Sequence, residues 1–349
     1  TSSKSATIQD LPLGKVYEFN VRAIDGNGHQ SGWSETQYKI VDLPYWTDVV
    51  TSQPAGYTED AAGNAAISSA EGLAWFAAKV SGLQGRAACA YEGKTVKLTA
   101  DIDLTGWRWA PIGFYNNDES TMKCFMGTFD GQEHAISNIY VNDEGSYQGL
   151  FSYAKGARFK NVNMVGGSVA TIFQRKDARQ AGETMAAIGG LIGEADRCYE
   201  ISNCHSSVSV SGSQWVGSLC GYVWASFDGI CRITNCSATG QTAGRESVGD
   251  LIGGTYGAEI IIQNCYATGD VTLTSGKKDA WYRGGLIGYV FFSTVDNCYA
   301  TGKVEDEELS KFIGRAIGCP QEAHLHYLYG RDDLNAALPL TGLECADAA

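Results

Sequence analysis

Apolar residues stand at every second position in several short segments of the chain. In residues 94–104 these positions are Val96, Leu98, Ala100, Ile102 and Leu104. A period of two is typical of a β-strand with one buried face. Residues 125–141 show the same alternation in two pieces around a turn. We therefore predict that 94–141 is built from short strands.

One segment has a helical period instead. Its apolar residues fall at the spacing of a single helix face: Leu73, Phe76, Ala77 and Val80. Ser68 and Glu71 just before them have the spacing of a capping box. We expect a helix over 69–80 that caps the N-terminal end of the strands after it. Residues 42–66, which contain both Pro44 and other turn-forming residues, are predicted to be a linker.

The first 41 residues have a pattern of their own. Apolar residues alternate over 17–23 and again over 37–41, which predicts two strands. The spacing of Leu11 and Tyr17 is similar to a tyrosine corner. This segment resembles the last three strands of a fibronectin type III domain. The resemblance implies a partial β-sandwich over 1–41.

From residue 147 the chain repeats itself. A Gly-x-Leu-x-Gly-like core is centred on Leu150, Leu191, Leu219, Leu251 and Leu286, and a degenerate sixth copy lies at 314–318. An asparagine follows each of these leucines, at Asn161, Asn203, Asn235, Asn264 and Asn297. Repeats of roughly 30 to 40 residues indicate a solenoid. Because the units show strand-like pieces and no helical stripe, we predict a β-solenoid.

The units "GGLIG" and "NCYATG" resemble the GLUG motif, most closely at 284–304 and 249–271. This resemblance implies an all-β, right-handed parallel β-helix over 67–320, with entry coils at 94–141, repeats at 147–318 and a C-terminal cap or tail at 319–349. It also implies an exported bacterial protein at the cell surface or outside the cell, adhesin-like or of the kind found in immunoglobulin A peptidases. Such peptidases carry their chemistry in a zinc-binding HExxH helix, and this sequence has no HExxH.

The repeat cysteines are the first candidates for chemistry: Cys204, Cys236, Cys265 and Cys298. Equivalent positions of a solenoid stack between turns, so these residues form a column. We predict that the column faces inward as small apolar side chains, because a ladder gives parallel rather than converging metal ligands and no nearby base. The pairing of the remaining cysteines that we considered stays open: Cys89, Cys124, Cys198, Cys231, Cys319 and Cys345.

Aromatic residues are the second candidates. Trp224, Tyr256 and Phe291 stand at the same place in consecutive units, and Tyr266 and Tyr299 follow two of the ladder cysteines. We expect all five to point outward, where they either contact a ligand or stack on one another.

Composition narrows the partners. With 26 Lys+Arg against 39 Asp+Glu, the net charge is −13, which disfavours nucleic acids and anionic membranes. No apolar run reaches the length of a membrane span. The first residues read like the interior of a domain, so we expect a fragment of a longer protein. We also expect a monomer. We predict neither a cofactor nor a metal, although the turns at 25–28 and Asp130 leave calcium open.

Four functions remain open. We predict first a non-catalytic module that binds a host or matrix glycoprotein or glycan. The alternatives are a non-catalytic region of an immunoglobulin A peptidase-like protein, a polysaccharide hydrolase or lyase, and a structural stalk. A hydrolase or lyase would need clustered carboxylates, of which Asp101 and Asp103, near Arg108, are the clearest pair in the sequence.

Overall fold

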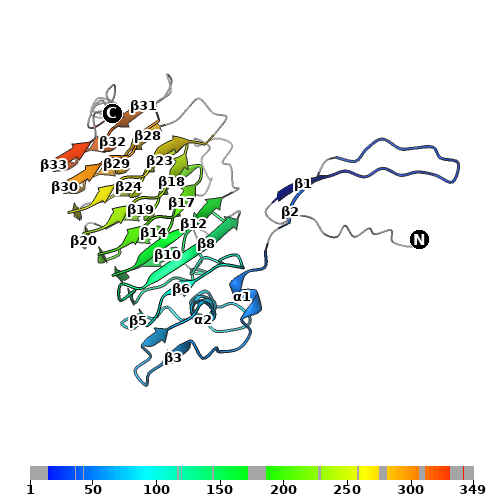
Figure 1. Cartoon of the computed structure of the whole chain (residues 1–349), viewed down its shortest axis with the longest axis horizontal. Helices are drawn as coiled ribbons and strands as arrows, with labels where there is room; N and C mark the ends of the chain where they lie inside the picture. The colour runs from blue at the N-terminus through cyan, green and yellow to red at the C-terminus, as the bar shows by residue number, and fades with distance from the viewer. Residues whose placement is uncertain are drawn as a thin grey trace.

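The computed structural model describes residues 15–35, 37–41, 43–115, 118, 120–143, 145–171, 186–226, 229–257, 259–274, 281–305, 311–330 and 341. Parallel strands stack into a solenoid of about 7 turns, with the N-terminal helices at one end (Figure 1). The all-β parallel β-helix predicted from the repeats is confirmed. In the described part of the chain, neither helix has the length and hydropathy of a membrane span.

Two of the solenoid's walls are six-stranded parallel sheets. Sheet I consists of β9 (Tyr147–Gln148), β13 (Ala187–Gly189), β18 (Gln214–Gly217), β23 (Glu246–Gly249), β28 (Trp281–Gly284) and β31 (Lys311–Gly314). Sheet II consists of β10 (Phe151–Lys155), β14 (Ile192–Asp196), β19 (Cys220–Trp224), β24 (Ile252–Tyr256), β29 (Ile287–Phe291) and β32 (Ile317–Gln321). In each turn a strand of sheet I leads through a tight corner into a strand of sheet II.

The rest of each turn belongs to a larger sheet, sheet III. Its early strands are β3 (Tyr57–Glu59), β4 (Ala65–Ile67), β5 (Thr95–Leu98), β6 (Ile102–Asp103), β7 (Thr128–Asp130) and β8 (Ala135–Asp143). The middle strands are β11 (Arg158–Lys160), β12 (Asn163–Thr171), β15 (Glu200–Ser202), β16 (His205–Ser206), β17 (Ser209–Ser211), β20 (Cys231–Thr234) and β21 (Ser237–Ala238). The last are β22 (Thr242–Gly244), β25 (Ile260–Gln263), β26 (Tyr266–Ala267), β27 (Val271–Leu273), β30 (Thr294–Ala300) and β33 (His324–Gly330).

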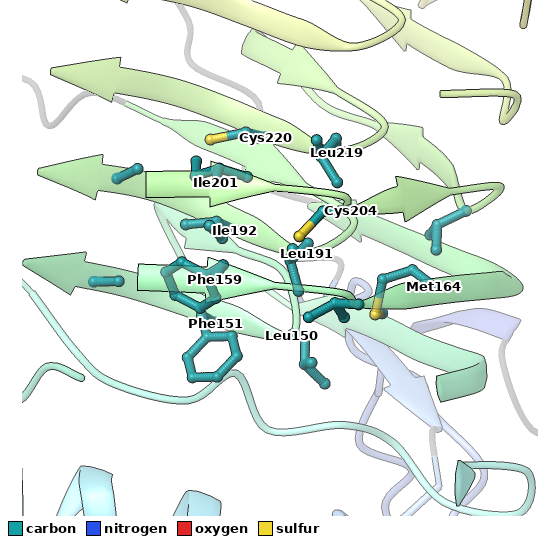
Figure 2. Close-up of a cluster of buried hydrophobic side chains, with 14 of the residues drawn as sticks. Leu150, Phe151, Phe159, Met164, Leu191, Ile192, Ile201, Cys204, Leu219 and Cys220 are labelled. Carbon is teal, nitrogen blue, oxygen red and sulfur yellow. The ribbon is translucent and has the colours of Figure 1, made fainter. Parts of the chain in front are cut away.

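The Gly-Leu core of each repeat forms the corner between sheets I and II. Leu150, Leu191 and Leu219 occupy the same place in successive turns, where they are fully buried (Figure 2). The glycines are needed because backbones of adjacent turns approach closely. A Cβ on Gly193 would lie 2.5 Å from the carbonyl oxygen of Ser152 in the preceding turn. The motif therefore places one large apolar side chain in the core and leaves no side chain where the turns meet.

The repeated asparagines form the corner within sheet III. Asn203 and Asn297 have φ angles of 52° and 50°, in the left-handed region that asparagine tolerates better than most residues. Their side chains also connect the turns. Asn297 Nδ2 donates to Asn264 Oδ1 at 2.7 Å, and Asn203 Nδ2 donates to Asn161 Oδ1 at 2.9 Å. The asparagine therefore fixes both the corner and the register between turns.

Helix α2 (Ala70–Ser81) lies at the N-terminal end of the stack (Figure 1). Its N-cap is Ser69, whose side chain accepts a hydrogen bond from the Gly72 amide, rather than the capping box expected from Ser68. The apolar stripe is buried, and Phe76 packs among the rings of the first turns. The helix thus covers the N-terminal end of the stack, which would otherwise be an open edge.

The predicted linker at 42–66 differs from the structure. Residues from 43 onward contain helix α1 (Trp46–Val49) and the antiparallel pair β3–β4, and β4 pairs in parallel with β5. Trp46 and Tyr57 belong to the main buried core. This segment is the first layer of the solenoid, because its apolar residues find partners in later turns that no local pattern reveals.

The N-terminal strands are β1 (Lys15–Phe19) and β2 (Gln37–Val41), which pair antiparallel. They form a two-stranded sheet away from the stack (Figure 1). Leu11 of the predicted tyrosine corner lies outside the described residues. The fibronectin-like assignment of 1–41 stays a prediction.

The repeats continue further than predicted at the other end. Residues 319–330 were expected to form a cap or tail, yet β32 and β33 extend the stack by another turn. In β33, Tyr329 stands in register with Tyr299 of β30. The register persists although the repeat sequence has faded, because strand pairing depends on the backbone and the inward apolar side chains. Apart from Thr341, residues after 330 lie outside the described part.

Candidate functional site

Trp224, Tyr256 and Phe291 lie in register on β19, β24 and β29 of sheet II. The rings of Tyr256 and Phe291 stack with their centroids 4.6 Å apart and an interplanar angle of 15°. Tyr256 is 42% exposed. The three residues predicted from their spacing therefore form one outward column.

A second column beside them extends this surface. It contains Tyr222 and Tyr289, but Gly254 stands between them in the register. Trp215 from sheet I fills this gap: its ring lies 4.6 Å from Tyr222 and 5.9 Å from Tyr289, and it occupies the space that a Cβ on Gly254 would need. The glycine and the tryptophan thus compensate each other across neighbouring turns.

The rings continue toward the N-terminal end of the stack. Tyr115 stacks on Tyr153 at 4.6 Å and lies 6.0 Å from Tyr147. Together these side chains form what we call the aromatic face of sheets I and II. Its members are Tyr115, Tyr147, Tyr153, Trp215, Tyr222, Trp224, Tyr256, Tyr282, Tyr289 and Phe291.

A buried pair of carboxyl groups lies among the rings of this face, in register with Tyr222 and Trp224. Glu194 and Asp196 are both on β14 and are only 7% and 3% exposed. Asp196 accepts hydrogen bonds from the Tyr153 hydroxyl at 2.6 Å and from the Arg197 guanidinium at 2.8 and 3.0 Å. Its charge is therefore compensated.

Glu194 is in a different state. Burial, followed by the neighbouring charge of Asp196, raises the pKa of Glu194 to about 8, and a hydrogen bond with Tyr147 opposes this shift. Its Oε2 has no hydrogen-bond partner among the described residues. The carboxyl group is thus mostly protonated at pH 7. This pair was not predicted, although the alternation in "GEAD" places both acids on one face of the strand.

Tyr266 and Tyr299 lie elsewhere, on sheet III. Their rings are parallel, with an interplanar angle of 6° and a centroid distance of 5.1 Å. Tyr329 continues this column in register. The structure therefore divides the five predicted aromatic residues between two walls, and only the column on sheet II joins a larger aromatic surface.

The four ladder cysteines are buried and unpaired. Cys265 Sγ lies 3.4 Å from the Cys236 amide, and Cys298 Sγ lies 3.4 Å from the Cys265 amide. Burial holds the pKa of Cys236 well above its usual value. A buried thiol with a raised pKa is a poor nucleophile. The column contributes core packing.

The other cysteines are spread over the solenoid. Cys124, Cys198 and Cys231 are buried and free, whereas Cys89 is partly exposed. Cys319 is disulfide-bonded. Cys345 lies outside the described residues.

The carboxylates singled out in the sequence make local contacts. Asp101 accepts from the Ala135 amide at 3.0 Å, and Asp103 accepts from Thr105 and from Asn138 Nδ2. These hydrogen bonds lower the pKa of both acids. Such carboxylates stay ionised and stabilise turns, so they do not form an acid–base pair.

The turns considered for calcium are similar. Asp25 accepts from the Asn27 and His29 amides, and Asp130 accepts from the Gln132 amide. Within the described ranges, no three His, Cys, Asp or Glu side chains converge as metal ligands would.

Two comparisons with known proteins gave a match, one to the repeats and one to the fold. A family model of the GLUG motif matches residues 212–243 and 279–305. The repeat units within these two ranges are GLUG motifs. The crystal structure of a "putative immunoglobulin A1 protease from Bacteroides ovatus" has a similar fold, with a TM-score of 0.53 over 78% of this chain and 76% of that chain. The sequences are 19% identical, so this likeness shows the fold alone. No curated protein sequence matches the chain.

In the repeats of the solenoid, the inward and outward positions differ in character. Phe151, Ile192 and Cys220 form one inward column of sheet II and are all buried and apolar. The outward positions change from turn to turn, as in Lys155, Asp196 and Trp224. The core of the motif thus maintains the solenoid, while the outward positions give each stretch of the wall its chemistry.

Proposed function

We propose that this GLUG-repeat solenoid is a non-catalytic recognition module, outside the bacterial cell, that binds a glycan or glycoprotein through the aromatic face. The observation that carries the proposal is the column of Trp224, Tyr256 and Phe291, which stand in register on adjacent strands with the last two rings stacked. The rings of Trp215 and Tyr289 lie beside it. Clustered aromatic rings on a rigid wall bury apolar surface at little entropic cost and suit the flat faces of sugar rings.

The fold likeness to an immunoglobulin A1 protease supports a related proposal. This chain would be a non-catalytic region of such a protein and would hold it on a glycosylated target. We expect immunoglobulin A to stay intact during long incubation with the chain. Cleavage of the antibody, detected by gel electrophoresis, would contradict this.

The pair Glu194 and Asp196 favours a hydrolase as the second candidate. Glycoside hydrolysis uses one protonated and one ionised carboxyl group. Here burial raises the pKa of Glu194 to about 8, and Asp196 beside it accepts a hydrogen bond from the Arg197 guanidinium. Their side chains are only 7% and 3% exposed, however, and neither lines the groove at the end of the aromatic face, so a glycosidic bond has no access to them. We therefore favour recognition. Release of reducing sugar from polysaccharides by the wild-type chain, lost in Glu194→Gln, would reverse this preference.

A glycan array followed by titration tests the proposal, with two matched variants. Tyr256 and Tyr299 are both stacked tyrosines, 42% and 41% exposed, on different walls. Tyr256→Ala should weaken binding by about tenfold, from the loss of one stacked ring. Tyr299→Ala should change affinity less than about twofold. Binding lost in Tyr299→Ala and kept in Tyr256→Ala would place recognition on sheet III, and no binding at all would favour a stalk.

A further inference from the structure

A groove of about 700 Å³ lies at the N-terminal end of the aromatic face. It is located where sheet I begins, since β9 is the terminal strand of that sheet. Its lining comes from the end of α2, from residues 110–115 and 121–123, and from the turn that leads into β9. Tyr115 and Tyr147 belong both to this groove and to the aromatic face.

Four aromatic side chains, Tyr45, Phe114, Tyr115 and Tyr147, line the groove among smaller residues. Phe114 is 50% exposed and lines the groove beside Tyr115, and Tyr45 lies among the other lining residues. Phe114 is held in place by backbone hydrogen bonds with Lys123 in both directions. An aromatic side chain that is half exposed although its backbone is fixed offers a ready stacking surface.

The groove also carries an unsatisfied polar group. Gln148 lines it and is only 2% exposed, yet its side-chain Oε1 has no hydrogen-bond partner among the described residues. A buried amide oxygen without a donor costs roughly 1 to 3 kcal/mol. A ligand hydroxyl would donate the missing hydrogen bond.

The charges in the groove nearly cancel. Lys123 supplies one positive group and Asp143 one negative group. The Asp143 carboxylate accepts from the Tyr45 hydroxyl at 2.5 Å, and the Arg108 guanidinium lies 4.1 Å from the centre of the Tyr45 ring. On a chain with a net charge of −13, this balance favours a neutral ligand over an anionic one.

We propose that this groove binds one or two rings of a neutral pyranoside. The aromatic side chains of the groove suit the apolar faces of such a sugar, the Gln148 oxygen accepts from a hydroxyl, and the volume lies within the range of small-ligand sites. The inference rests on the proposed function, because it names the sugar class and adds a second contact region at the end of the same face.

The probes are methyl pyranosides of glucose, galactose, mannose and N-acetylglucosamine, with methyl glucuronate as the anionic counterpart. Binding to the full chain is followed by saturation-transfer NMR and titration. At least one neutral pyranoside should bind, and glucuronate should bind more weakly. Phe114→Ala should weaken the neutral sugar by about fivefold, the loss of one stacked ring. Gln148→Leu should weaken it by about tenfold, the loss of one hydrogen bond.

Tyr299→Ala is the matched control, because it removes a stacked ring on sheet III, outside both the groove and the aromatic face. It should leave pyranoside affinity unchanged. Because Phe114 is half exposed, its substitution is not expected to disturb folding, so an unchanged affinity in Phe114→Ala would overturn the groove assignment. Failure of every pyranoside, tighter binding of glucuronate, or binding of an unglycosylated peptide instead would overturn it as well. Array binding sensitive to Tyr256→Ala would still leave the proposed function standing, so the two failures are distinguishable.

Discussion

Glu194 is a buried carboxyl group whose folded environment favours the neutral form. Replacing it with glutamine keeps the shape of the side chain and removes the ionisable proton. The pKa of Glu194 is raised from its ordinary value of 4.5 to about 8, first by burial and then by the charge of Asp196. Glu194→Gln therefore isolates a free-energy cost: that of keeping this carboxyl group protonated in the fold at a pH where it would ionise in the unfolded chain.

The sign and size of the effect follow from proton linkage. Because the folded pKa is raised, the stability associated with Glu194 is fully present below pH 4.5 and is lost as pH rises toward 8. At pH 7 the unfolded chain has lost the proton and the folded chain has kept it. The difference of about 2.5 pH units, at about 1.4 kcal/mol each, amounts to about 3 kcal/mol. Glu194→Gln should therefore be more stable than wild type by about 3 kcal/mol at pH 7.

Urea unfolding followed by circular dichroism between pH 4 and pH 8 measures this difference. The gain should vanish near pH 4, where both states of the wild type are protonated. Some pH dependence should remain in the variant, because burial also raises the pKa of Asp250 to about 8. Glu92→Gln, at an exposed turn position, is the control and should stay within about 0.5 kcal/mol of wild type. A gain that does not depend on pH, or a less stable Glu194→Gln at pH 7, would refute the reasoning.

The remaining predictions concern the repeat. Asn264→Ala should destabilise the fold by about 2 kcal/mol in urea unfolding, because it strains the left-handed corner and removes the ladder hydrogen bond. Asn264→Gly removes only the hydrogen bond and should lose about half of that, so equal losses would contradict the role of the corner. Gly193→Ala should lower the free energy of unfolding by about 3 kcal/mol, whereas Gly229→Ala, at a position with open space around it, should lower it by less than about 0.5 kcal/mol. Similar losses would rule out close backbone approach as the reason for the glycine at 193. A thiol reagent should modify Cys89 quickly and Cys265 only after unfolding, as mass spectrometry of the labelled peptides would show; fast labelling of Cys265 in the folded chain would overturn its inward position.

The local pattern was enough to predict the corners of the solenoid. Leu191 and Asn203 recur because each turn needs one large side chain in the core and one residue that tolerates a left-handed backbone. These requirements are the same in every turn, so they leave a period in the sequence. The helix predicted over 69–80 was found at 70–81 for a similar reason, since its apolar stripe is local, although its N-cap is Ser69 and not Ser68.

The limits of the solenoid were harder to predict. The segment at 42–66 showed no period of its own, and the Tyr57 hydroxyl finds one of its partners in Tyr91, which lies outside the segment. Similarly, β33 keeps its register although the motif has faded. In both places the strand pairs with the backbone of a neighbouring turn, so the contacts that define it involve residues outside the segment.

The column of Trp224, Tyr256 and Phe291 was determined by the sequence alone, because residues at one repeat position must stack once turns pair in register. Only the tertiary structure decided which columns become one surface. Trp215 crosses to fill the space above Gly254, and Tyr147 reaches Glu194 from another strand. Burial of that carboxyl group depends on how the rings of several turns close over it. The spacing of the repeats specifies where a residue lies along the stack. Its exposure and protonation depend on side chains from several turns that contact one another.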